Sequence, residues 1–242
     1  MSDESSTKLN NLQNDLFKYL LSTPRTTPSA ALCWDFGAMP IKFMIMKEKL
    51  TLLYHIVSLD NNSLANEIYM TQKKFKFPGL TSECMKMIHE LGIPNITEDN
   101  IRQHISKLKW KKIVKDAVKK ACEVELKREI KDLKKLKNGP MIEENFSTKS
   151  YLKEYCLDEA RTLFKYRSKM LNFKFNYKND VKNLQELWNC DSCQSAIESQ
   201  DHILWCPAYV DLRKGKSLES DEDLVQYFSS VMKIREKLQL KK

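Results

Sequence analysis

The sequence predicts an all-α fold that carries one small cysteine-rich module near its C-terminus. Apolar residues recur at steps of three and four through most of the chain, which is the spacing of amphipathic helices. Glycine and proline are few, at 5 and 7 of 242 residues, and they tend to fall between the periodic segments, where helices end. Three of the seven cysteines and one of the four histidines fall within residues 190–206, which sets this segment apart.

The expected helices fall into three consecutive regions, residues 1–78, 79–139 and 140–242. The second boundary lies at Asn138-Gly139-Pro140, which ends the longest helical signal of the chain. We expect helices over residues 8–21, 29–32, 41–59, 61–74, 82–91, 97–137 and 157–171, and from Ser220 onwards.

Two of the expected helices have a clear apolar face. The helix over residues 8–21 is amphipathic, with Leu9, Leu12, Leu16 and Leu20 on its apolar side. The helix over residues 41–59 is apolar on most sides and is therefore expected at the centre of a core. Its periodic apolar positions are Phe43, Met46, Leu50, Leu53 and Val57.

Nearly all of the net charge of +9 lies in one segment. Residues 107–137 hold 13 basic and 5 acidic residues, whereas the rest of the chain holds 28 basic and 27 acidic ones. The apolar face of the helix expected here consists of Trp110, Ile113, Ala117 and Ala121, followed by Leu126, Ile130 and Leu133. The helix would turn this apolar face inward and its basic side outward. That side is either an ordinary solvated face or, as we favour, a surface that contacts phosphates. Its candidate contacts are Lys107, Lys109, Lys111, Lys112, Lys115, Lys119 and Lys120.

A complete set of metal ligands lies between residues 190 and 206. Cys190 and Cys193 form a Cys-x-x-Cys pair, and His202 and Cys206 are four residues apart, which places them on one face of a helix. Three thiolates and one imidazole suit tetrahedral zinc, and four protein ligands leave no position open for water. The sequence thus predicts one structural Zn²⁺. The other cysteines stand alone and are expected to be small core residues.

Aromatic residues flank the cysteine-rich segment. Residues 172–178 alternate Phe173, Phe175 and Tyr177 with lysine and asparagine, which fits either one buried strand face or a basic, aromatic patch. Trp188 and Trp205 are expected to cover the metal, with base stacking as the alternative.

The chain opens with polar residues and shows neither a signal peptide nor a membrane span. An odd number of cysteines beside a metal-type cluster points to a reducing compartment, so we expect a nuclear or cytoplasmic location and no membrane partner. We also find no phosphate-binding glycine loop and no convincing catalytic constellation, and we expect no small-molecule substrate.

Four stretches give the chain a family resemblance. The first three are Leu12-Gln13-Asn14 with residues 22–28, Asp35 to Phe43, and residues 53–57. The fourth runs from residues 163–170 through Asn176-Tyr177 to Cys206-Pro207-Ala208-Tyr209. In these stretches the chain resembles the C-terminal part of the reverse transcriptase polyproteins of non-long-terminal-repeat retrotransposons, although the family commonly has Glu where this chain has Asp35. The likeness spans roughly residues 9–230 and is most specific in the Arg-x-Thr-Pro passage and in the spacing of the Cys/Cys/His/Cys set.

The resemblance implies a thumb-like helical region over residues 1–78, a basic helical segment over residues 79–139, and a zinc knuckle that helps to grip template RNA or target DNA. The palm and endonuclease of the family are missing from this sequence, so the resemblance implies no catalytic residue here and we expect no enzyme activity. Beside the lysines above, Arg167, Lys169, Lys174 and Tyr177 are expected to face nucleic acid near the knuckle.

Two other functions remain open on the sequence. The chain could be a protein-interaction module, in which case an exposed apolar groove is expected on the helix over residues 43–57. It could also be the non-catalytic part of an RNA-directed DNA polymerase assembly whose palm domain is supplied by another chain. RNA and DNA are not distinguished as partners.

Overall fold

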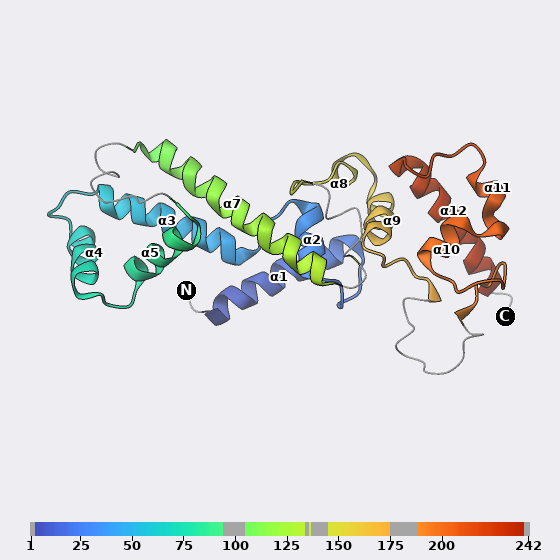
Figure 1. Cartoon of the computed structure of the whole chain (residues 1–242), viewed down its shortest axis with the longest axis horizontal. Coiled ribbons are helices and arrows are strands. Elements are labelled where there is room, and N and C mark those ends of the chain that lie inside the picture. The colour runs from blue at the N-terminus through green and yellow to red at the C-terminus, as the bar shows by residue number, and fades with distance from the viewer. Residues whose placement is uncertain (1–2, 94–104, 134–135, 137–144, 175–187, 240–242) are drawn as a thin grey trace. The chain divides into compact units, whose positions relative to one another are not determined.

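The computed structural model describes residues 3–93, 105–133, 136, 145–174 and 188–239, and it is built from helices and turns (Figure 1). Among these residues the only β-type pairing is an isolated antiparallel bridge between Asn189 and Ile197. The all-α prediction is therefore confirmed.

The chain forms two compact units that interleave in the sequence. Unit 1 comprises residues 1–14 and 38–128, and unit 2 comprises residues 15–37 and 129–242. This division does not follow the three consecutive regions expected from the sequence: the chain changes unit three times, once after Gly37 and twice inside helices. These helices are α1 (Asp3–Leu21) and α7 (Lys107–Asp132).

The core of unit 1 surrounds α3, as its apolar sequence predicts. Leu50, Leu53 and Val57 are fully buried, and the indole N–H of Trp110 from α7 donates to the Leu50 carbonyl over 2.9 Å. Ser63 caps the following helix by accepting a hydrogen bond from the backbone N–H of Asn66. The helices around this core are α3 (Ile41–Ser58), α4 (Leu64–Phe75) and α5 (Leu80–Glu90).

Helix α7 is shorter than the expected helix over residues 97–137. Ser106 is not helical; its hydroxyl accepts the Lys109 N–H, and so caps a helix that begins at Lys107. Residues 97–104 lie outside the described part. The inner face agrees with the prediction at Trp110, Leu126 and Ile130 and differs at Ile113, Ala117 and Ala121, which are half-buried. The buried side chains step by four, and each step turns about 40° around the helix. They are Trp110, Val114, Val118, Cys122, Leu126 and Ile130.

Three of the four leucines on the predicted apolar side of α1 are uncovered, and the fourth, Leu20, is half-buried. Leu9, Leu12 and Leu16 are exposed, whereas Asn14 is buried. Polar side chains make the contacts within unit 1, where Asn10 accepts the backbone N–H of Ile41 over 3.2 Å. The leucine spacing indicates a helix correctly, but it does not determine whether a partner covers that face.

The first part of unit 2 is organised around α2 (Ser29–Phe36), whose Trp34 is fully buried against Phe146. Gly37 ends this helix with a left-handed φ of 59°. The remaining helices of unit 2 are α8 (Tyr151–Glu154), α9 (Leu157–Arg167), α10 (Gln200–Trp205), the short 3-10 helix η4 (Pro207–Tyr209), α11 (Val210–Arg213) and α12 (Asp221–Gln239).

An aromatic cluster joins α9 to α12 in unit 2. Tyr166 and Phe173 both pack against Phe228, with ring centroids 5.1 and 6.3 Å away. Phe173 is thus a core residue and does not lie on a strand, whereas Phe175 and Tyr177 lie outside the described residues. This cluster supports the segment that follows, in which the four candidate ligands lie.

Candidate metal centre

A short hairpin positions the first two ligands. The Asn189–Ile197 bridge closes it, and the Cys190 N–H donates to the Ala196 carbonyl over 2.8 Å. The chain reverses within the loop, where Gln194 takes a left-handed φ of 55° and its N–H donates back to Cys190. Cys190 and Cys193 therefore lie on either side of one tight turn.

Helix α10 positions the other two ligands. The Ser199 hydroxyl caps this helix by accepting the backbone N–H of His202 over 3.0 Å. Cys206 follows the last helical residue, and Pro207, which has no N–H to donate, begins the next element. One helical turn thus separates His202 from Cys206 and leaves both on the side that faces the hairpin.

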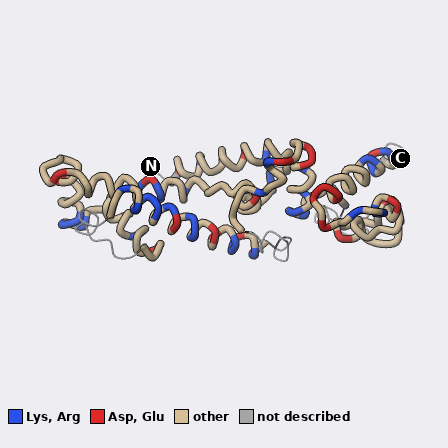
Figure 2. The backbone as a smooth tube through the Cα atoms, turned by 90° about the horizontal axis from the view of Figure 1, so that it is seen from above, with Lys and Arg blue, Asp and Glu red and all other residues tan. Residues whose placement is uncertain are grey.

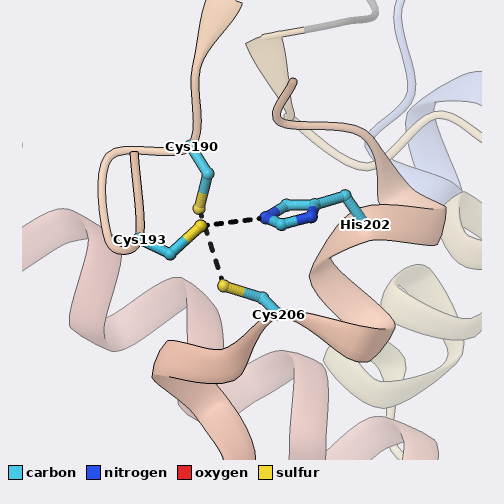
Figure 3. Close-up of side chains that lie close together, drawn as sticks. All are labelled: Cys190, Cys193, His202 and Cys206. Carbon is cyan, nitrogen blue, oxygen red and sulfur yellow. Dashed lines mark hydrogen bonds between the residues drawn. The ribbon is translucent and has the colours of Figure 1, made fainter. Parts of the chain in front are cut away.

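The four side chains converge as the sequence predicts (Figure 3). One ligand atom from each of Cys190, Cys193, His202 and Cys206 lies within 4.8 Å of all the others. Cys193 Sγ is 3.3 Å from His202 Nε2, and Cys190 Sγ is 3.8 Å from Cys206 Sγ. Cys190 and Cys206 are buried, so this group can hold a metal ion away from bulk water.

The thiols differ in acidity. Burial raises the pKa of Cys190, and it raises the pKa of Cys206 to about 12. Burial also acts to raise the pKa of Cys193, but hydrogen bonds from Ser195 and His202 outweigh it and bring this pKa down to about 6. Because metal ligands must be deprotonated thiolates, an ion that binds here has to displace the protons of Cys190 and Cys206.

Buried polar contacts fix the cluster to the rest of unit 2. Glu198, in the hairpin, forms a buried ion pair with Arg235 of α12. Arg235 also donates to the Asn172 carbonyl over 2.6 Å, and Arg213 donates to the carbonyl of the ligand Cys206 over 2.9 Å. No sequence pattern predicts the Glu198–Arg235 pair, since only the fold brings these residues together.

The two tryptophans near the cluster differ from each other. Trp188 is 8% exposed, next to the hairpin, whereas Trp205 is 72% exposed. The expectation that both cover the metal is therefore wrong for Trp205, because its neighbours Ile203 and Cys206 take the inward positions of that turn.

The lysines of α7 lie on the outside of unit 1. All seven are exposed, and none forms an ion pair with another residue in the part of the chain that the structure describes. Figure 2 shows the basic positions that follow one another along this helix. The sequence-predicted set is Lys107, Lys109, Lys111, Lys112, Lys115, Lys119 and Lys120.

The four nucleic-acid contacts expected near the knuckle differ from the α7 lysines, because two of them already bind acidic side chains. Arg167 is mostly buried and paired with Asp35, and Lys174 binds Asp191 and the Asn189 carbonyl, each over 2.8 Å. Lys169 ends α9 in a left-handed conformation, 4.0 Å from Asp201, and remains partly exposed. Tyr177 lies outside the described residues. Arg167 and Lys174 thus already have structural partners.

Comparison with models of protein families, with curated proteins and with solved structures finds no match to this chain. None of the described helices combines the length and the hydropathy needed to cross a bilayer. The chemistry of the chain's own side chains is therefore the basis for assigning its function.

Proposed function

We propose that this protein binds nucleic acid, that the α7 lysines contact its phosphates, and that one structural zinc ion organises the hairpin beside α10. The observation that carries the proposal is the run of seven exposed lysines without an ion-pair partner among the described residues. Within residues 107–120 the only acidic side chain is Asp116. Such a surface attracts a polyanion by releasing its condensed counterions.

The length of this surface suits a nucleic acid. From Lys107 to Lys120 the helix rises about 20 Å, at 1.5 Å per residue. Successive phosphates of one DNA strand are about 3.4 Å apart along the axis, so the surface is long enough to lie beside roughly six of them.

The spacing of the candidate ligands favours zinc. For Zn–S bonds of about 2.3 Å, two sulfurs at the corners of a tetrahedron are about 3.8 Å apart, and Cys190 Sγ and Cys206 Sγ are separated by 3.8 Å. Four protein ligands complete the shell, so the ion would stabilise the fold and would not activate water. The proposed role agrees with the resemblance to the C-terminal part of a retrotransposon reverse transcriptase, which would grip template RNA or target DNA without catalysis of its own.

A charge-matched pair of variants tests the proposed surface. Changing Lys111, Lys115 and Lys119 to alanine should lower affinity for a short duplex at low salt at least tenfold and reduce the slope of log K against log salt by about three. Changing Lys74, Lys86 and Lys153 to alanine removes the same charge from exposed positions elsewhere, and should change affinity much less. Equal losses in the two variants would refute a specific surface on α7.

A second function is favoured by the apolar side chains of α1. The face expected for protein docking, on α3, is buried at Phe43, Leu50 and Val57, whereas Leu12 and Tyr19 of α1 are 67% and 79% exposed. Contiguous exposed apolar residues are typical of protein-binding surfaces, and Leu12 lies between the exposed Leu9 and Leu16 on one side of this helix. If the wild-type protein fails to bind nucleic acid at low salt, the interaction-module function replaces the first proposal.

A further inference from the structure

Trp205 is exposed in a protein that buries its other tryptophans. Trp34 and Trp110 are fully buried and Trp188 is 8% exposed, but Trp205 is 72% exposed. The residue lies at the end of α10, directly before the ligand Cys206. The backbone of Trp205 is fixed by two buried neighbours, Ile203 and the ligand Cys206. Its indole therefore points to solvent.

A hollow of about 670 Å³ lies beside this indole, entirely within unit 2. Trp205 and Tyr166 provide aromatic walls, and Arg213 and Lys216 provide two cations. Arg213 is oriented by its bond to the Cys206 carbonyl and Lys216 by a bond to Gln226, so both cations are held near the indole. The metal cluster and the hollow thus share their supporting contacts.

A second hollow, of about 630 Å³, adjoins the first, since Tyr166, Leu218 and Glu219 line both. The two together form a groove, which we call the Trp205 groove. The charged side chains that line it are the cations Lys149, Arg167, Arg213 and Lys216 and the acids Glu219 and Asp221. Two of the cations have acidic partners outside the lining, since Arg167 pairs with Asp35 and Lys216 lies 3.9 Å from Asp223.

An exposed indole beside a half-buried tyrosine and two cations matches one chemical class of ligand, a single nucleic-acid strand. Unpaired bases stack on tryptophan and tyrosine, while the backbone phosphates pair with lysine and arginine. A duplex keeps its bases stacked on each other and offers the groove phosphates alone. Acidic partners offset most of the positive charge of the groove, so stacking has to supply much of the affinity.

We propose that the Trp205 groove binds single-stranded RNA or DNA, with a base stacked on the Trp205 indole. The inference rests on the proposed function in one respect, since both name nucleic acid as the ligand. The site is a different one: it lies in unit 2 and recognises bases, whereas the α7 lysines lie in unit 1 and contact phosphates.

Tryptophan fluorescence of the full-length, zinc-loaded protein tests the groove. The probes are an oligothymidylate of about eight nucleotides and an abasic strand of the same length, which has the phosphates but not the bases. The oligothymidylate should quench the emission of Trp205 and the abasic strand should not. Trp205→Ala should abolish the quenching and weaken binding of the oligothymidylate roughly tenfold, while Trp205→Phe should keep most of the affinity.

Two controls separate the groove from the α7 surface. Because Trp205 is mostly exposed, Trp205→Ala should keep the zinc content and circular dichroism of the wild type. The Lys111, Lys115 and Lys119 variant should lose duplex binding yet retain the quenching by oligothymidylate.

Each other outcome counts against one proposal. If the abasic strand binds as tightly as the oligothymidylate, or if Trp205→Ala binds the oligothymidylate as tightly as the wild type, the groove proposal is refuted. The proposal for the α7 surface is not affected by either result. The opposite result is also informative. If the quenching requires Trp205 but the α7 lysine variant binds duplex as tightly as the wild type, the proposed α7 surface is refuted and the Trp205 groove is supported. Absence of binding to any strand overturns both.

Discussion

Asp35 shows how one residue organises the interior of unit 2. Its carboxylate is fully buried, accepts a hydrogen bond from the Tyr151 hydroxyl over 2.6 Å, and lies 3.2 Å from the Arg167 guanidinium. Burial raises the pKa of Asp35, against the lowering effects of Arg167 and Tyr151. Arg167, a candidate nucleic-acid contact by sequence, therefore neutralises a buried acid.

Arg167→Met should destabilise the protein by about 3–5 kcal/mol at pH 7, because it leaves the buried charge of Asp35 without a partner. Chemical denaturation followed by circular dichroism measures the loss. Adding Asp35→Asn to Arg167→Met removes that charge, so the double variant should recover part of the stability. A double variant no more stable than the single one would show that the ion pair is not the cause.

The same variant has a defined pH dependence. Without Arg167 the folded-state pKa of Asp35 rises further above its unfolded value, so the folded state binds a proton that the unfolded state does not. Stability is then gained as the pH falls through the raised pKa toward the unfolded value of about 4. The stability difference between wild type and Arg167→Met should therefore shrink as the pH falls from 7 to 5.

At the scale of the element, the end of helix α2 depends on a glycine. Gly37 adopts a left-handed φ, and a Cβ at this position would lie 2.5 Å from the carbonyl carbon of Ser147. Backbone atoms at that distance cannot move aside as a flexible side chain can. The segment around Ser147 is held here, since the Lys149 N–H donates to the Asp35 carbonyl over 3.0 Å.

Gly37→Ala should therefore destabilise the protein by clearly more than the cost of the left-handed conformation alone, which is about 1–2 kcal/mol. Gly92→Ala is the matched control, because Gly92 has a φ of +60° but open space around it. Thermal unfolding of the two variants gives the comparison. Similar losses in both would show that the segment at Ser147 yields to the added methyl group.

At the scale of the molecule, the ligand cluster and its supporting contacts belong to unit 2, while the seven candidate lysines of α7 and the α3 core belong to unit 1. The proposed zinc ion ties the hairpin to the end of α10 through Cys190 and Cys206, whose raised pKa values otherwise keep these two thiols protonated. The free energy of zinc binding therefore contributes to the folding stability of this part of unit 2.

Protein purified under reducing conditions should contain one equivalent of zinc, and Cys190→Ser should contain much less. Hydrogen exchange in the variant should then accelerate in α10 and in the parts of α12 that contact it, while α3 and α5 keep their protection. Cys156→Ser, at an exposed cysteine outside the cluster, is the control and should keep the zinc. A well-folded wild type without metal would refute the site.

The sequence alone determined the helical class, the central place of α3 and the four residues of the candidate metal centre. Helical periodicity and the spacing of Cys190, Cys193, His202 and Cys206 are local properties, because neighbouring turns of one segment produce them. The same periodicity is a weaker guide to where a helix ends. The sequence predicted a helix that begins at Thr97, whereas α7 begins at Lys107.

The tertiary structure decided which faces are covered. It buried the α7 residues that step by four, left Leu9 and Leu12 of α1 exposed, and placed Trp205 in solvent. It also paired Arg167 with Asp35 and Arg235 with Glu198, across long separations in sequence. Local patterns cannot specify such contacts, because burial and ion pairing depend on which distant segment the fold places opposite each side chain.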